Sequence, residues 1–91
     1  MVKRIRIVAG GRVQGVGFRY FTEDKAAEYH ITGWVRNLYD RSVECEAQGE
    51  EATLSIFCEA VKEGPARAVV SSFTVTEIPV VVGEAGFYVR V

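Results

Sequence analysis

Two segments of different periodicity are joined by the stretch Gly10-Gly11-Arg12-Val13-Gln14-Gly15-Val16-Gly17-Phe18-Arg19. Before it, Ile5, Ile7 and Ala9 alternate with more polar residues, which predicts a strand with one apolar face. From Phe18 the apolar residues follow a helical period instead. Glycine tolerates positive φ, so a glycine-rich connection can curl and turn successive N–H groups toward one point. At the start of a helix such a loop can form an anion-binding site, because the partial positive charges of the N–H groups converge there.

Two interpretations of this loop are open from composition alone. It is either a glycine-rich turn with an exposed arginine, or an anion site completed by the planar guanidinium of Arg19. The helix dipole disfavours a cation at an N-terminus, so Arg19 in the first helical turn suggests that an anion is supplied from outside. The loop has no Gly-Lys-Ser/Thr ending, and it lacks the full Gly-x-Gly-x-x-Gly spacing, so it is neither a P-loop nor a dinucleotide fingerprint.

The rest of the chain also alternates between segments of helical and of strand periodicity. The helix that begins at Phe18 should bury Thr22 and Ala26 and end before Gly33. A hairpin is expected next, with strands at 34–38 and 43–48 joined by a turn at 39–42. A second helix is predicted over 50–62, a strand over 69–78 and a short strand over 87–91.

This βαββαβ order, with an extra short strand, predicts an α+β fold of the ferredoxin-like, split βαβ type. Two helices that are each apolar along one stripe should cover one face of an antiparallel sheet. The right-handed crossover rule then places the first and third strands side by side at the centre of the sheet. The length, 91 residues, is that of a single domain, which we expect to span 1–91.

Composition excludes several classes of protein. The formal net charge is −1, so the chain has no bulk attraction for nucleic acid or an anionic membrane, and we expect neither as a partner. No apolar run approaches the ~20 residues that span a bilayer, and the charged N-terminal residues are unlike a signal peptide. Cys45 and Cys58 lack a metal-binding spacing and are expected to be buried free thiols. Such thiols favour a cytoplasmic location, and we also expect a monomer.

Few residues are suited to acid–base or nucleophilic catalysis. The single histidine, His30, is predicted at a helix end with a surface or capping role. The serines have no recognisable base partner, and no cluster of ligands predicts a metal site, so neither a metal nor another cofactor is expected. Glu44 and Glu46 alternate on the open face of the hairpin, where we expect them to be solvated.

Asn37 is a neutral amide at the end of a predicted strand, and it also has two interpretations. Asparagine is common in turns, so it could simply start the turn that follows. Alternatively, its amide lies near the anion-binding site and hydrogen-bonds a water molecule there. The residues alone leave both open.

Gly11 to Arg19 resembles the G-x-V-Q-G-V-x-F-R signature of the acylphosphatase family, and Gly33 to Asn37 resembles that family's second signature, G-x-V-x-N. The pair Gly64-Pro65 and the alternating C-terminal strand also fit, so the resemblance covers essentially the whole chain. One departure is Arg41, where many relatives carry glycine in the turn after Asn37.

The resemblance implies metal-free hydrolysis of the carboxyl-phosphate bond of acyl phosphates to a carboxylate and inorganic phosphate. Arg19 is similar to the family's phosphate-binding arginine, and Asn37 to the asparagine that positions the attacking water. The phosphate-binding loop would comprise Gln14, Gly15, Val16, Gly17 and Phe18. The expected partners are a small-molecule acyl phosphate and the phosphate product.

Three other classes remain alternatives. A non-catalytic module that binds phosphate or another anion could use the same fold, as could a detached domain of a carbamoyl-transfer enzyme. The Arg19–Asn37 pair and the length argue against both. An RNA-binding ferredoxin-like domain would need stacking aromatics on the central strands, which carry none, and a basic sheet.

Overall fold

Each change of periodicity in the chain marks a change of secondary structure. The computed structural model describes residues 1–91, and neither of its helices is long and apolar enough to cross a membrane. The elements are β1 (Val2–Arg12), α1 (Phe18–Glu28), β2 (Thr32–Asn37), β3 (Val43–Glu50), α2 (Glu51–Glu63), β4 (Val69–Ile78) and β5 (Phe87–Val89). The predicted βαββαβ order with a short C-terminal strand is confirmed.

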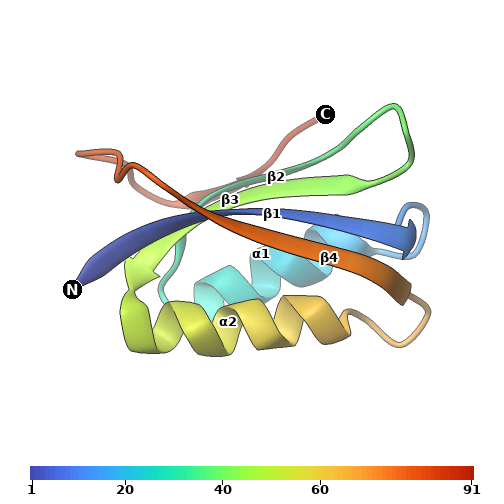
Figure 1. The fold of residues 1–91 in the computed structure, drawn as a ribbon, viewed down its shortest axis with the longest axis horizontal. Coiled ribbons are helices and arrows are strands. Elements are labelled where there is room, and N and C mark those ends of the chain that lie inside the picture. The colour runs from blue at the N-terminus through green and yellow to red at the C-terminus, as the bar shows by residue number, and fades with distance from the viewer.

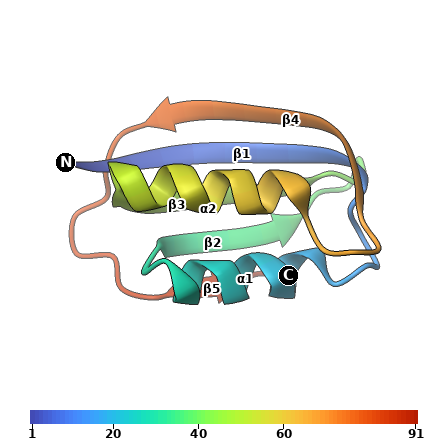
Figure 2. The ribbon, with the colours of Figure 1, turned by 90° about the horizontal axis from the view of Figure 1, so that it is seen from below.

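The strands form one five-stranded sheet in the order β4-β1-β3-β2-β5, and both helices cover the same face of it (Figures 1 and 2). β1 and β3 pair side by side at its centre, as expected. β1 pairs antiparallel with β3 and β4, and β2 pairs antiparallel with β3. β5 pairs in parallel with β2, so the sheet is mixed rather than wholly antiparallel. The long connection from β4 carries the chain to the opposite edge before β5 begins, which permits the parallel pairing.

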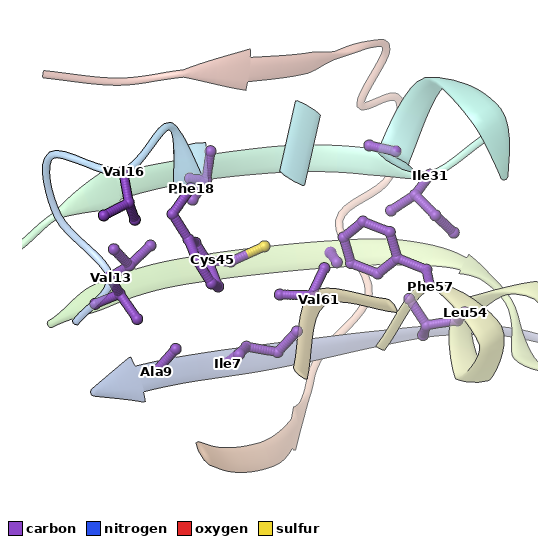
Figure 3. Close-up of a cluster of buried hydrophobic side chains, with 14 residues drawn as sticks. Ile7, Ala9, Val13, Val16, Phe18, Ile31, Cys45, Leu54, Phe57 and Val61 are labelled. Atoms are coloured by element: carbon purple, nitrogen blue, oxygen red, sulfur yellow. The ribbon is translucent and has the colours of Figure 1, made fainter. Parts of the chain in front are cut away.

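The core lies between the sheet and the helices (Figure 3). Phe57 of α2 is fully buried beside Leu54 and Val61, which confirms the helical stripe. Complete burial of one such side chain stabilises the fold by about 2 kcal/mol. Ile7 and Ala9 reach the same cluster from β1, and their burial confirms the alternating pattern of that strand.

Both cysteines are free thiols, as expected. Cys45 is buried in the core from β3, whereas Cys58 of α2 is only partly buried. Burial raises the pKa of both thiols, so the side chains act as small apolar groups.

β1 is longer than the alternating pattern indicates. Gly10 and Gly11 were expected to open the loop, but both pair with β4, opposite Ser72 and Val70, across a shift of register. A side chain at Gly11 would collide with the carbonyl oxygen of Val69, so glycine permits this close pairing. The loop proper is therefore Val13–Gly17.

The sheet face opposite the helices is not the solvated acidic surface that we expected. The Arg4 side chain is only 2% exposed there, and it donates hydrogen bonds to Glu46, Gln48 and Glu84. Glu84 belongs to the β4–β5 connection, which passes across this end of the sheet (Figure 1). The same connection contacts Gln48 through Val81, whose N–H donates to the Gln48 side chain.

Glu44 is the clearest exception to the expected solvation. Its side chain is 7% exposed and accepts hydrogen bonds from Arg6 of β1 and Arg36 of β2. Burial raises the pKa of Glu44, but these two arginines outweigh it and hold the pKa below its usual value. The expectation failed because Arg36 lies directly opposite Glu44 on β2, and Arg6 reaches the same carboxylate from a diagonal position on β1.

Candidate active site

The loop Val13–Gly17 turns the chain from β1 into α1 with its backbone uncovered. Gly15 and Gly17 have φ of 74° and 79°, in the left-handed region that favours glycine. None of the backbone N–H groups from Gln14 to Tyr20 donates to an acceptor within the protein. Several of these donors open the helix, where the dipole adds positive potential. The loop and the helix start therefore offer an uncompensated array of donors to an anion.

A pocket of about 180 Å³ lies against this array and brings together the two residues singled out in the sequence, Arg19 and Asn37. The loop and the β2–β3 turn lie at the same end of the molecule (Figure 1). The other residues that line the pocket are Val13, Gly15, Gly17, Phe18 and Tyr20. Val16 and the ring of Phe18 are buried in the core, so these two residues can offer an anion only their backbone.

Arg19 lies in the first turn of α1 and pairs with no carboxylate. Its only hydrogen bond runs from Nη1 to the carbonyl oxygen of Arg90, at 2.8 Å. A guanidinium has five N–H donors, so most of its donors remain available to a ligand. This cation is thus held at a helix N-terminus without an internal counter-ion. The contact with Arg90 carries no signal in the sequence, because it joins residues at opposite ends of the chain.

Asn37 is the last residue of β2 and pairs with Val43 of β3. The turn that follows is closed by Leu38 N–H on the Ser42 carbonyl, at 2.9 Å. Ser42 also donates to the Asp40 carboxylate from its hydroxyl and its backbone N–H, which lowers the pKa of Asp40. These bonds close the turn without the Asn37 side chain. Asn37 therefore both precedes a turn and lines the pocket.

Gln14 connects the loop to that turn. Its side-chain Nε2 donates to the carbonyl oxygens of Leu38 and Ser42, at 2.9 Å each. Only the Gln14 backbone N–H is therefore left for an anion. The side chain instead holds the loop at a fixed position relative to Asn37. The local sequence does not predict this contact, because its partners are distant along the chain.

A second, larger depression of about 800 Å³ adjoins the pocket and shares Asn37 with it. Its lining includes Gln14, Arg36, Tyr39 and Arg41, and no acidic residue. His30 lines neither of these hollows; it is exposed beyond the end of α1, in agreement with the surface role expected for it. No group of three or more His, Cys, Asp and Glu side chains is arranged to hold a metal ion.

The fold and pocket define a small α/β sandwich with a glycine loop of unpaired backbone N–H groups at a helix start. The acylphosphatase family model matches residues 5–89. The acylphosphatase of Bacillus subtilis is 49% identical over 72 residues, 79% of each chain. That of Clostridium acetobutylicum is 42% identical over 87 residues, 96% of each chain. The chain belongs to the acylphosphatase family.

Solved structures agree with this assignment. The chain superposes on the crystal structure of acylphosphatase from Bacillus subtilis with a TM-score of 0.93 and 42% identity, over the whole of both chains. It also superposes on part of full-length HypF in the phosphate- and nucleotide-bound form, with a TM-score of 0.87 and 29% identity. That match covers 99% of this chain and 12% of HypF. The protein is thus an acylphosphatase by both sequence and fold.

Proposed function

We propose that this protein hydrolyses the carboxyl-phosphate bond of small-molecule acyl phosphates, releasing a carboxylate and inorganic phosphate without a metal ion. The observation that carries the proposal is the pocket in which Arg19, Asn37 and the unpaired N–H groups of the loop converge. The family assignment supplies the reaction class, and the pocket supplies groups suited to it.

The phosphoryl group would lie against the loop. Backbone N–H groups from Gly15 to Phe18 would donate to its oxygens, and Arg19 would add a planar pair of charged donors. Phosphoryl transfer proceeds through a loose transition state that is stabilised mainly by positioning and by positive charge. Donors fixed by backbone geometry need no reorganisation as charge develops.

Asn37 would position the attacking water. Its amide both donates and accepts, so it can orient the water oxygen toward phosphorus. The water oxygen then bonds to phosphorus while the bond from phosphorus to the acyl oxygen breaks, and the acyl group leaves as a carboxylate. A carboxylate is a stable leaving group, so no general acid is required. The water gives one proton to a phosphate oxygen of the substrate, which makes a protein base unnecessary.

We further propose that the protein works as a monomer in the cytoplasm and binds neither nucleic acid nor membranes. The two free cysteines support the cytoplasmic location, and the net charge of −1 supports the absence of binding to nucleic acid and membranes.

The proposed function is tested by release of phosphate from benzoyl phosphate in the presence of excess EDTA. We expect turnover that follows enzyme concentration and is unchanged by the chelator. Binding of phosphate without turnover would identify a non-catalytic anion-binding module instead. Loss of turnover in EDTA, with recovery on addition of Mg²⁺, would contradict the metal-free mechanism.

A further inference from the structure

The depression that adjoins the pocket lies where the acyl part of a substrate must extend. It shares Asn37 with the pocket, and Gln14, which also lines it, directly follows the pocket residue Val13. When the loop holds the phosphoryl group, the acyl part of the substrate must extend out of the pocket. The larger hollow, about 800 Å³, begins at Asn37 and can receive that group.

The charged side chains that line this depression are all basic. Its lining includes the arginines Arg36 and Arg41 and no acidic residue. Arg36 does pair with Glu44, but the same carboxylate also pairs with Arg6, so two guanidinium groups share one negative charge. The side chain of Arg36 is 44% exposed, so it remains accessible to a ligand.

Arg41 has no internal counter-ion. It is exposed and forms none of the ion pairs of the protein. The neighbouring carboxylate of Asp40 accepts two hydrogen bonds from Ser42 on Oδ1 and forms no ion pair with Arg41. Arg41 is therefore a free cation at the edge of the depression.

The backbone at Arg41 adopts a conformation that disfavours a side chain. Its φ is 75°, in the left-handed region where a side chain is unfavourable and glycine is not. Glycine would suit this turn better on backbone grounds alone. Strain of this kind is typical of functional sites, and here it places a guanidinium beside the depression.

We infer that the depression is an acyl-group subsite and that Arg36 and Arg41 select acyl phosphates whose acyl part carries a second negative charge. The inference rests on the proposed function and adds the substrate class. A distal carboxylate or phosphate would lie between the two guanidinium groups while the transferred phosphoryl group lies against the loop.

The test compares two rigid substrates of nearly equal shape, 4-carboxybenzoyl phosphate and its neutral amide, 4-carbamoylbenzoyl phosphate. Because their leaving groups differ in intrinsic reactivity, the informative quantity is how the ratio of their kcat/KM values changes between protein variants. Arg41→Asn removes the charge and tolerates the left-handed backbone, whereas Arg41→Lys keeps a charge. Arg67→Gly is the control, since it removes an exposed arginine of the α2–β4 connection that lines neither hollow.

We expect Arg41→Asn to lower the carboxyl-to-carbamoyl ratio about 3- to 5-fold, mainly through KM, which is the scale of one exposed charge pair. Arg41→Lys should keep most of the ratio, Arg67→Gly should leave it unchanged, and added salt should reduce it in the unsubstituted protein. Two results would overturn the subsite alone, provided that both substrates are hydrolysed. One is a carboxyl-to-carbamoyl ratio in Arg41→Asn that equals the ratio of the unsubstituted protein. The other is a ratio that falls as far in Arg67→Gly as in Arg41→Asn. Hydrolysis of neither would overturn the proposed function, and the subsite with it.

Discussion

Arg19 and Arg90 are joined by a 2.8 Å hydrogen bond from the guanidinium of the first to the backbone carbonyl of the second. Arg90 is itself fixed in two ways. Its N–H donates to the Val35 carbonyl at 2.8 Å, and its guanidinium stacks on the Trp34 ring at 4.6 Å. The proposed phosphate-binding side chain is thus oriented by β2 through the residue that follows β5. Orientation of this kind leaves less side-chain freedom to be lost when the anion binds.

Removal of the Arg19 guanidinium should abolish most of the activity. We expect Arg19→Ala to lower kcat for benzoyl phosphate by roughly 10³-fold or more, on the scale of an arginine that stabilises a phosphoryl transition state. Arg19→Lys should not restore it, because an ammonium lacks the planar pair of donors. Arg67→Ala serves as a matched control and should retain full activity. A rate close to that of the unsubstituted protein in Arg19→Ala would refute the role assigned to Arg19.

Substitution of Asn37 should affect turnover and phosphate binding differently. In Asn37→Ala the loop donors and Arg19 remain, so inorganic phosphate should still inhibit with nearly unchanged affinity. Turnover should collapse because the water is no longer oriented. The measurement is kcat together with the inhibition constant of phosphate. If affinity for phosphate falls in step with kcat, Asn37 is a binding residue and not a positioner of water.

Gln14 should matter through its side chain, not through contact with the substrate. Gln14→Met keeps the approximate shape and removes both hydrogen bonds to the β2–β3 turn, at Leu38 and Ser42. We expect a loss of about 1–3 kcal/mol in the free energy of unfolding, measured by urea titration. We also expect kcat to fall more than the affinity for phosphate, because the Gln14 N–H is retained while Asn37 is displaced. Unchanged stability together with weaker phosphate binding would place the side chain on the ligand instead.

Glu44 should make stability depend on pH in the acidic range. The pKa of Glu44 is lowered in the folded protein. Its contribution to the free energy of unfolding is therefore present above the pKa of an unfolded glutamate, ~4.3, and is lost as pH falls through the folded pKa. Glu44→Gln should therefore cost about 2 kcal/mol at pH 7, and the gap from the unsubstituted protein should narrow as pH falls below ~4. Urea titrations across this range measure the gap. A gap that is constant with pH would show that the charge of Glu44 is not what stabilises the fold.

Local patterns were sufficient for the elements and the core. The stripe that contains Leu54, Phe57 and Val61 is a property of thirteen consecutive residues, so its burial needed no knowledge of the rest of the chain. The glycines at 15 and 17 likewise mark a curled loop by their own conformational freedom. Asn37 was located by its motif, and the structure places it in one pocket with Arg19.

Features that depend on pairing between distant strands were not predictable in the same way. The Glu44 carboxylate looks solvated until β1 and β2 are placed on either side of it. The extension of β1 through Gly11 depends on the approach of β4, and the Gln14 contact depends on where the hairpin turn lies. Such contacts are specified by register and topology, which the local pattern does not contain.

The brevity of β5 has a consequence for dynamics. Only Phe87, Tyr88 and Val89 pair with β2, at an edge of the sheet, whereas β1 is paired along both sides. Such a segment can open at a free-energy cost well below that of global unfolding. Each opening releases the carbonyl of Arg90 and frees the Arg19 side chain while the helices and the other four strands stay folded. We therefore expect fraying of this edge to reduce the fraction of molecules in which Arg19 is oriented, so that heating lowers activity before the core melts.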